Sequence, residues 1–290
     1  MNDVITTEIE CLLGERSVDR RSFVVTSLGK GFAPAVLPVT AQTITTPADG
    51  LVAGEVKVKT KDGEMPAYRA MPATGINFPV ILVVQEIFGV HEYIKDVCRR
   101  LARNGFFAIA PELYARQGDA SKYTDIPTLI SEIVTKVPDA QVLADLDATV
   151  AFAKASGKAD TARLGITGFC WGGRIVHMYA AHNSNVRAAV AWYGPTARAY
   201  AVGDKTPLNV ASQIKGAVLG LYGGADDGIP NDTVEKMFAA LKAAGNTRSE
   251  FVIYPDTPHA FHADYRPSYR KPQADEAWNR MLAWFKLNLA

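Results

Sequence analysis

The chain has 290 residues with 31 basic and 30 acidic side chains, which gives a formal net charge of +1. Its composition is 48% hydrophobic and 21% charged, as expected for a globular protein with one large core or two modest ones. The balanced charge excludes a strong field for nucleic acid, and no apolar run reaches the roughly 18 residues that span a bilayer.

Residues 1–41 differ from the remainder of the chain. Arg20 and Arg21 precede an apolar stretch and small residues that end at Ala41, an order typical of a twin-arginine export signal. Asp19 and Lys30 count against that interpretation. We therefore favour a cytoplasmic location for a domain over 42–290, with periplasmic export, or an N-terminal arm or packed helix, as alternatives.

From Thr43 onward, predicted strands and helices alternate. Period-two alternation over 55–60 and turn residues after it predict a hairpin with 66–72, and a β-branched run over 78–89 predicts a strand buried on both faces. Strands, two of them with the loop that follows, are predicted at 106–114, 162–169, 186–194, 216–230 and 249–261, and helices at 91–105, 125–136, 138–154, 172–183, 231–246 and 274–289.

This rhythm predicts a single α/β domain with a mostly parallel sheet covered by helices on both faces. In such sheets the chemistry gathers at the carboxyl ends of the strands. That rule directs attention to the loops after Val84, Phe169, Tyr222 and Tyr254.

The loop after Phe169 carries a candidate nucleophile. Gly168-Phe169-Cys170-Trp171-Gly172 has the spacing of G-x-S-x-G, with cysteine in place of serine. Glycines on both sides allow a strained strand-to-helix turn, and the start of the following helix favours a thiolate. A structural thiol in a glycine-rich turn is the alternative. Cys98 is expected to be a core residue, and three cysteines, with Cys11, suggest neither a disulfide framework nor a zinc site.

The loops after Tyr254 and Tyr222 supply a candidate base and acid. His259 follows the last strand, where a general base would lie, and the competing histidines are His262, His177, His182 and His91. Asp226 or Asp227 could orient the base, with Asp256 as the alternative. The order nucleophile, acid, base along the chain is that of α/β-hydrolases.

The loop after Val84 has the sequence QEIFGV. In α/β-hydrolases an early strand is followed by a loop that gives one oxyanion-hole N–H, and the residue after the nucleophile gives the other. That rule nominates the backbone N–H groups of Ile87 and Trp171.

Five separated motifs, QEIFGV, APELYARQG, GFCWGG, GGADDGIP and PHAF, resemble the dienelactone hydrolase (carboxymethylenebutenolidase) family from about Ala53 to the C-terminus. The resemblance implies one α/β-hydrolase domain with a Cys-His-Asp triad, and it selects Asp226 over Asp227 and His259 over His262. It implies that Glu86 is a resting-state partner of Cys170. The chain departs from the family at Ala263, where dienelactone-cleaving members carry a second arginine.

The resemblance also implies residues that bind the substrate. Arg116 matches an arginine that anchors a substrate carboxylate, and Phe88 and Tyr193 match pocket-lining aromatic residues, with core packing as their alternative. Arg266 lies near the departure at Ala263 but out of register, so the substrate could differ from dienelactone.

The resulting hypothesis is a hydrolase of a small lactone or carboxylic ester, with or without a carboxylate, that works through an acyl-cysteine. It needs no metal or organic cofactor. We expect no nucleic-acid partner and a monomer or small homo-oligomer. The alternatives are a redox-responsive or binding protein without turnover, since an exposed low-pKa thiol is an oxidation target, and a thioesterase.

Overall fold

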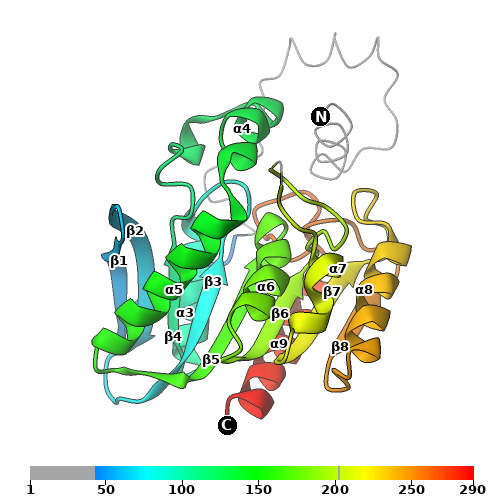
Figure 1. Ribbon diagram of the computed structural model, residues 1–290. Helices are drawn as coiled ribbons and strands as arrows, with labels where there is room; N and C mark the ends of the chain where they lie inside the picture. Colours follow the sequence, from blue (N-terminus) through cyan, green and yellow to red (C-terminus); the bar gives the residue numbers. More distant parts are fainter. Residues whose placement is uncertain (1–42, 202) are drawn as a thin grey trace.

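The computed structural model describes residues 43–201 and 203–290 (Figure 1). The segment 1–41, considered above as an export signal or an N-terminal arm, lies outside these residues, and the favoured cytoplasmic location stays a prediction. Within the described ranges, no helix is long and apolar enough to cross a membrane.

The strands of the described chain are β1 (Leu51–Thr60), β2 (Gly63–Pro72), β3 (Phe78–Val84), β4 (Phe107–Pro111), β5 (Ala159–Phe169), β6 (Val186–Trp192), β7 (Ala217–Gly223) and β8 (Glu250–Tyr254). They form one sheet in the order β1-β2-β4-β3-β5-β6-β7-β8. β2 pairs antiparallel with both β1 and β4, and the remaining neighbours pair parallel. The predicted hairpin and the mostly parallel sheet are confirmed.

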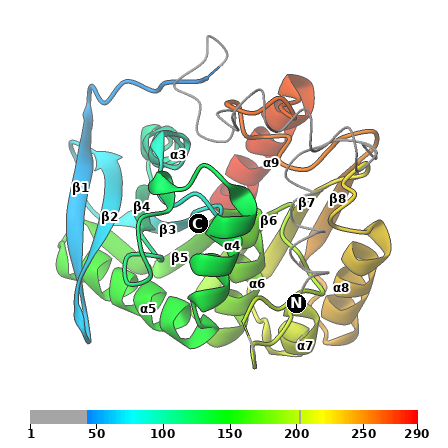
Figure 2. The ribbon, with the colours of Figure 1, turned by 90° about the horizontal axis from the view of Figure 1, so that it is seen from above.

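The helices are α3 (Glu92–Arg103), α4 (Ile126–Glu132), α5 (Asp139–Ala155), α6 (Trp171–His182), α7 (Pro207–Val210), α8 (Asn231–Ala243) and α9 (Lys271–Asn288), with 3₁₀ turns η1 (Ala120–Lys122), η2 (Val134–Lys136) and η3 (Ala211–Gln213). Seen from above, α3 and α9 lie on one side of the sheet, and α5, α6 and α8 lie on the other (Figure 2). The predicted α/β fold of a single domain is therefore confirmed.

The apolar run of β3 is buried as predicted, because residues 80–84 at the centre of the sheet have no exposed surface. One predicted helix differs from the structure. The segment 125–136 forms α4 and then η2, with the change at Ile133. Ile133, Val134 and Thr135 are all β-branched, and such side chains lose rotamer freedom in an α-helix, which favours the break.

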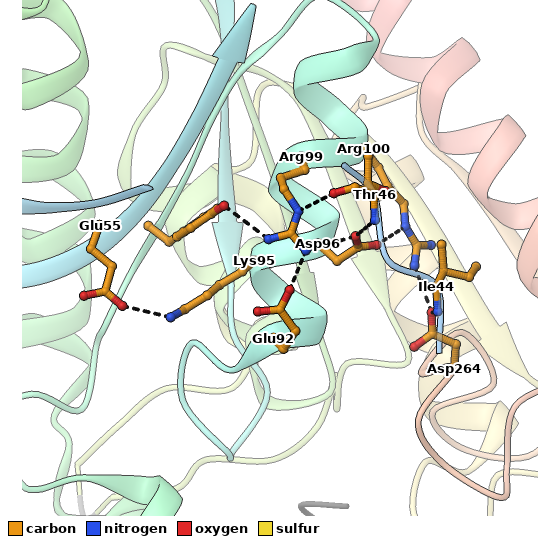
Figure 3. Close-up of polar contacts among 10 residues, drawn as sticks. Ile44, Thr46, Glu55, Glu92, Lys95, Asp96, Arg99, Arg100 and Asp264 are labelled. Atoms are coloured by element: carbon orange, nitrogen blue, oxygen red, sulfur yellow. Dashed lines mark hydrogen bonds and ion pairs between the residues drawn. The ribbon is translucent and has the colours of Figure 1, made fainter. Parts of the chain in front are cut away.

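The segment before β1 is fastened to α3 by charged side chains (Figure 3). The Thr46 N–H donates to Asp96 Oδ1 (2.5 Å), and Arg99 Nε donates to the Thr46 carbonyl (2.8 Å). Arg100 donates to Asp96 and also to Asp264 in the loop before α9. We call Asp96, Arg99, Arg100 and Asp264 the arginine network. It joins the start of the described chain to the loop that carries His259.

Candidate active site

Cys170 lies in the tight turn predicted between β5 and α6. Its backbone has φ 55° and ψ −119°, a conformation that L-residues rarely adopt, and its N–H donates to the Trp192 carbonyl (3.0 Å). A Cβ on Gly168 would lie 2.4 Å from the Gly172 oxygen, and one on Gly172 would lie 2.4 Å from the Gln85 oxygen. The two glycines are therefore required, and they bring the start of α6 against the loop after β3.

This turn places Cys170 at the start of α6. The cysteine is the N-cap residue of α6, so its sulfur lies at the end of the helix where N–H groups and the positive end of the dipole gather. The side chain is buried among the residues at the carboxyl edge of the sheet. A helix N-terminus lowers the pKa of a cysteine thiol, whereas burial in apolar surroundings raises it.

His259 and Asp226 come together at the same edge of the sheet, although they follow different strands. His259 Nδ1 lies 2.6 Å from Asp226 Oδ2, and both side chains are buried. Asp226 Oδ1 accepts from the Gly228 N–H (3.0 Å), which fixes the carboxylate. His259 Nε2 has no hydrogen-bond partner among the described residues. The Asp226 carboxylate thus holds the imidazole through Nδ1, which is the geometry that a base and its orienting acid require.

The two other aspartates considered as the partner of His259 lie differently. Asp227 and Asp256 are both exposed. Asp256 also takes a positive φ of 51° in the turn before His259. The geometry therefore brings Asp226, and neither of its two competitors, against His259.

The competing histidines are occupied elsewhere. His262 Nδ1 lies 2.6 Å from the Tyr93 hydroxyl, and its ring stacks between Phe169 and Trp278. Burial and the charge of Arg100 hold the pKa of His262 well below its usual value. His177 on α6 lies against the Tyr222 hydroxyl on β7, and burial lowers the pKa of His177 to about 4. His182 pairs with Asp147 at the surface. None of these three shares a hydrogen bond with a candidate residue of the triad.

The loop that carries Glu86, Ile87 and Phe88 is fixed against the loop after β4. Glu112 Oε2 accepts from the Val90 N–H (2.8 Å), and Gln85 Oε1 accepts from the Leu113 N–H (3.2 Å). The side chains of Glu86, Ile87 and Phe88 are buried. A rigid loop beside the start of α6 is what a preorganised oxyanion hole needs. The roles of the Ile87 and Trp171 amides stay predictions.

Glu86 is a buried carboxylate with neighbours that the sequence did not predict. Its Oε2 accepts from the Tyr265 hydroxyl (2.6 Å) and lies 3.6 Å from His91 Nε2. Burial would raise the pKa of Glu86, but the nearby His91 imidazole, the charge of Arg266 and the Tyr265 hydroxyl outweigh it and hold that pKa below its usual value. His91, considered above as a base, is therefore a neighbour of Glu86.

Tyr193 lies among the candidate catalytic groups. It is fully buried, with a positive φ of 37°, and its ring packs edge-on against the ring of His259 at 5.0 Å between centroids. Burial, chiefly, and the charge of Glu86 raise the pKa of its hydroxyl well above the usual value. A strained backbone at such a place is typical of a functional site. The sequence signal for Tyr265 and Tyr193 is their position in loops at the carboxyl edge of the sheet.

Arg116 has two carboxylate partners within the chain. Its guanidinium donates to both oxygens of Asp62, in the β1–β2 turn, and to both oxygens of Asp145 on α5. A substrate carboxylate could bind there only if part of these contacts were exchanged. The anchoring role of Arg116 therefore stays a prediction, as do the pocket-lining roles of Phe88 and Tyr193. Over the described part of the chain, no cluster of three or more acidic, histidine or cysteine side chains could hold a metal ion.

Comparison with known proteins gives one consistent result. The sequence profile described as "Dienelactone hydrolase family" matches residues 65–289. A protein of Methylorubrum extorquens named "Putative carboxymethylenebutenolidase" is 61% identical over 281 residues, which are 96% of each chain. An Escherichia coli K12 protein with the same name is 51% identical over 270 residues, 91% of this chain and 97% of that one. A crystal structure titled "Putative Dienelactone Hydrolase" from Klebsiella pneumoniae is 54% identical in sequence and has a TM-score of 0.78. The match covers 81% of this chain and 98% of that chain.

Proposed function

The chain belongs to the dienelactone hydrolase family of lactone and ester hydrolases, and we propose that it cleaves a small lactone or carboxylic ester through Cys170, His259 and Asp226. The observation that carries the proposal is the buried His259–Asp226 pair, 2.6 Å apart, at the edge of the sheet where the strained turn holds Cys170. An acid that orients a base, beside a nucleophile at a helix start, is the arrangement for acyl transfer.

The reaction has two halves. His259 Nε2 takes the proton of the Cys170 thiol, and the sulfur attacks the carbonyl carbon. The tetrahedral intermediate then expels the alkoxide, which receives that proton from His259, and an acyl-cysteine remains. In the second half His259 deprotonates a water molecule, which attacks the thioester and releases the acid and the thiol. Asp226 keeps the imidazole in the required tautomer and stabilises its charged form.

The other site residues support these steps. The Ile87 and Trp171 N–H groups stabilise the oxyanion, and a single donor of this kind is worth roughly 2.7–4 kcal/mol. Glu86 is the partner of Cys170 in the resting enzyme. Phe88 and Tyr193 line the space for the acyl group, and Arg116 anchors a substrate carboxylate. None of these steps requires a cofactor.

Substitution of the nucleophile tests this proposal. We expect Cys170→Ala to lower kcat for p-nitrophenyl acetate and for simple lactones by about 10³-fold or more. The matched control is Cys98→Ala, which removes a buried thiol in α3 and should leave kcat within about twofold of the unsubstituted enzyme.

Undiminished turnover in both Cys170→Ala and Cys170→Ser would refute the mechanism. A protein that shows neither acylation of Cys170 nor turnover would instead match the alternative of binding without hydrolysis. A thioesterase would show a large preference for acyl thioesters over oxygen esters.

A further inference from the structure

Arg116 holds two carboxylates that come from different parts of the chain. Its Nε and Nη2 donate to the two oxygens of Asp62 (2.8 and 2.7 Å), and its Nη1 and Nη2 donate to the two oxygens of Asp145 (2.6 and 2.9 Å). These contacts use most of the N–H groups that a guanidinium offers. A further carboxylate that binds through both of its oxygens must therefore displace one of the two aspartates.

The two aspartates differ in how firmly they are held. The side chain of Asp145 on α5 is 3% exposed, whereas that of Asp62, in the turn between β1 and β2, is 46% exposed. Removing the partner of a buried charge is costly, but an exposed ion pair competes with water and contributes little. Hydrogen bonds from Arg116 and Thr60 hold the pKa of Asp62 well below its usual value, so it is ionised at neutral pH. Asp62 is therefore the carboxylate that another anion can replace.

The Arg116 loop lies against the start of α6. Tyr114, two residues before Arg116, packs edge-on against Trp171 at 4.9 Å between ring centroids. Trp171 follows Cys170 and is the first residue of α6. Because β2 runs antiparallel to β4, the β1–β2 turn extends past the carboxyl end of β4. Asp62 thus meets Arg116 at the same edge of the sheet as the candidate nucleophile.

The charges around the guanidinium favour a carboxylate over a more highly charged anion. Within the two ion pairs, one positive charge faces two negative charges. Exchange of Asp62 for a carboxylate monoanion keeps this balance, whereas a dianion such as phosphate would add a negative charge beside Asp145. The planar fork of the guanidinium also matches the two oxygens of a carboxylate.

We propose that Asp62 is an internal ligand of Arg116, and that a carboxylate on the substrate binds Arg116 by displacing Asp62 while Asp145 stays in place. Asp62 is then a specificity-determining residue, because it competes with esters that carry a carboxylate and not with neutral esters. The inference deepens the proposed function and rests on it for the ester that is bound.

Removal of the Asp62 charge tests this competition. Mono-p-nitrophenyl adipate and p-nitrophenyl hexanoate have acyl chains of equal length, and only the first carries a carboxylate. We expect Asp62→Asn, which suits the same turn, to raise the ratio of kcat/KM for the adipate ester to kcat/KM for the hexanoate ester about two- to fivefold. Glu64→Gln is the matched control, since it removes the same charge from the same hairpin, at a pair with Lys57, and should leave this ratio unchanged.

A second background shows whether Asp62 acts through Arg116. In Arg116→Ala the ratio should be low, and adding Asp62→Asn should not raise it. An unchanged or lower ratio in Asp62→Asn, an equal rise in Glu64→Gln, or the same rise in the Arg116→Ala background would overturn the inference.

Binding without turnover separates this inference from the proposed function. The dissociation constant of adipate is measured by calorimetry for Cys170→Ala and for the same protein with Asp62→Asn added, and we expect it to fall about two- to fivefold. If this fall is seen but hydrolysis does not depend on Cys170, the proposed function is wrong and the exchange at Arg116 stands. If hydrolysis depends on Cys170 but the dissociation constant does not fall, the inference is wrong.

Discussion

Two buried polar clusters of this molecule contrast in how they are paired. In the arginine network, carboxylates face guanidinium groups: both oxygens of Asp96 accept hydrogen bonds from arginines, and Asp264 Oδ2 accepts from Arg100 (Figure 3). In the candidate active site, an aspartate faces an imidazole, and polar atoms are left over. Among them are His259 Nε2, Glu86 Oε1 and the Tyr193 hydroxyl, none of which has a hydrogen-bond partner among the described residues.

This contrast distinguishes a structural cluster, the arginine network, from a functional one, the candidate active site. Buried charges that meet opposite charges hold elements together, and removing one partner leaves the other uncompensated. Buried polar groups without partners cost stability and are retained where a ligand or a reaction uses them. Asp264 Oδ1, in the arginine network, also has no partner in the described chain. The two clusters therefore differ in whether each carboxylate meets an opposite charge, and not in whether every polar atom has a hydrogen bond. Substitutions in the two clusters should therefore affect different quantities.

The largest effect is expected in the active site. Asp226→Asn keeps the shape of the side chain but favours the wrong tautomer of His259, so kcat for ester hydrolysis should fall by about 10³–10⁴-fold. The matched control is Asp227→Asn at the exposed neighbouring position, with kcat within about twofold. Steady-state kinetics with p-nitrophenyl acetate measures both. Equal losses in the two variants would mean that the loop, and not the Asp226 carboxylate, matters.

Substitution in the arginine network should lower stability rather than activity. Asp96→Ala leaves Arg99 and Arg100 without their buried acid, and we expect the free energy of unfolding to fall by about 3–5 kcal/mol. Urea unfolding followed by circular dichroism gives this value. The exposed pair of Asp232 and Lys236 is the control, since Asp232→Ala should lower the free energy of unfolding far less than Asp96→Ala. A thousandfold loss of kcat in folded Asp96→Ala protein would contradict the contrast.

A smaller effect should appear in the pH dependence of stability. Burial holds the pKa of His177 at about 4 in the folded chain, below its unfolded value of 6.5. The unfolded chain therefore takes up this proton first, and stability is lost as pH falls from 6.5 to 4, by about 3 kcal/mol in total. His177→Gln should remove that part of the loss, as measured by urea unfolding at several pH values. An unchanged difference between pH 6.5 and 4 would show that His177 is protonated in the fold.

The smallest effect is expected at Arg116. If this arginine anchors a substrate carboxylate, Arg116→Ala should raise KM about tenfold for esters that carry a carboxylate and leave KM for neutral esters unchanged. Arg163→Ala, which removes a surface ion pair with Asp160, is the control. Equal KM changes for both kinds of ester would assign Arg116 to holding Asp62 and Asp145 instead.

Much of the fold was predictable because its signals are local. The β-branched run over 78–89 and the alternation over 55–60 depend on residues next to one another. β3 begins where predicted and ends earlier, at Val84, whereas β1 ends where predicted and begins earlier, at Leu51. The segment 125–136 shows the limit, since a short β-branched run changed one helix into two pieces. The short helix α7 was not predicted, because its four residues carry no periodic pattern.

The site was predictable only as far as motifs and strand ends allow. The glycine spacing around Cys170 and the position of His259 follow from the sequence, and the pairing with Asp226 agrees with the predicted order of residues. The contacts of Glu86 could not be predicted. Tyr265 lies 179 positions away along the chain, and nothing local links the two. The carboxylate partners of Arg116 were missed for the same reason.

Mass spectrometry of the quenched reaction tests the central claim most directly. The protein is mixed with p-nitrophenyl acetate, stopped in acid during the first turnovers, and digested. The account predicts an added acetyl group on the peptide that contains Cys170, which disappears once the ester is consumed, and no such adduct in Cys170→Ala. Sustained hydrolysis with the acetyl group on another residue, or with undiminished rate in Cys170→Ala, would contradict it.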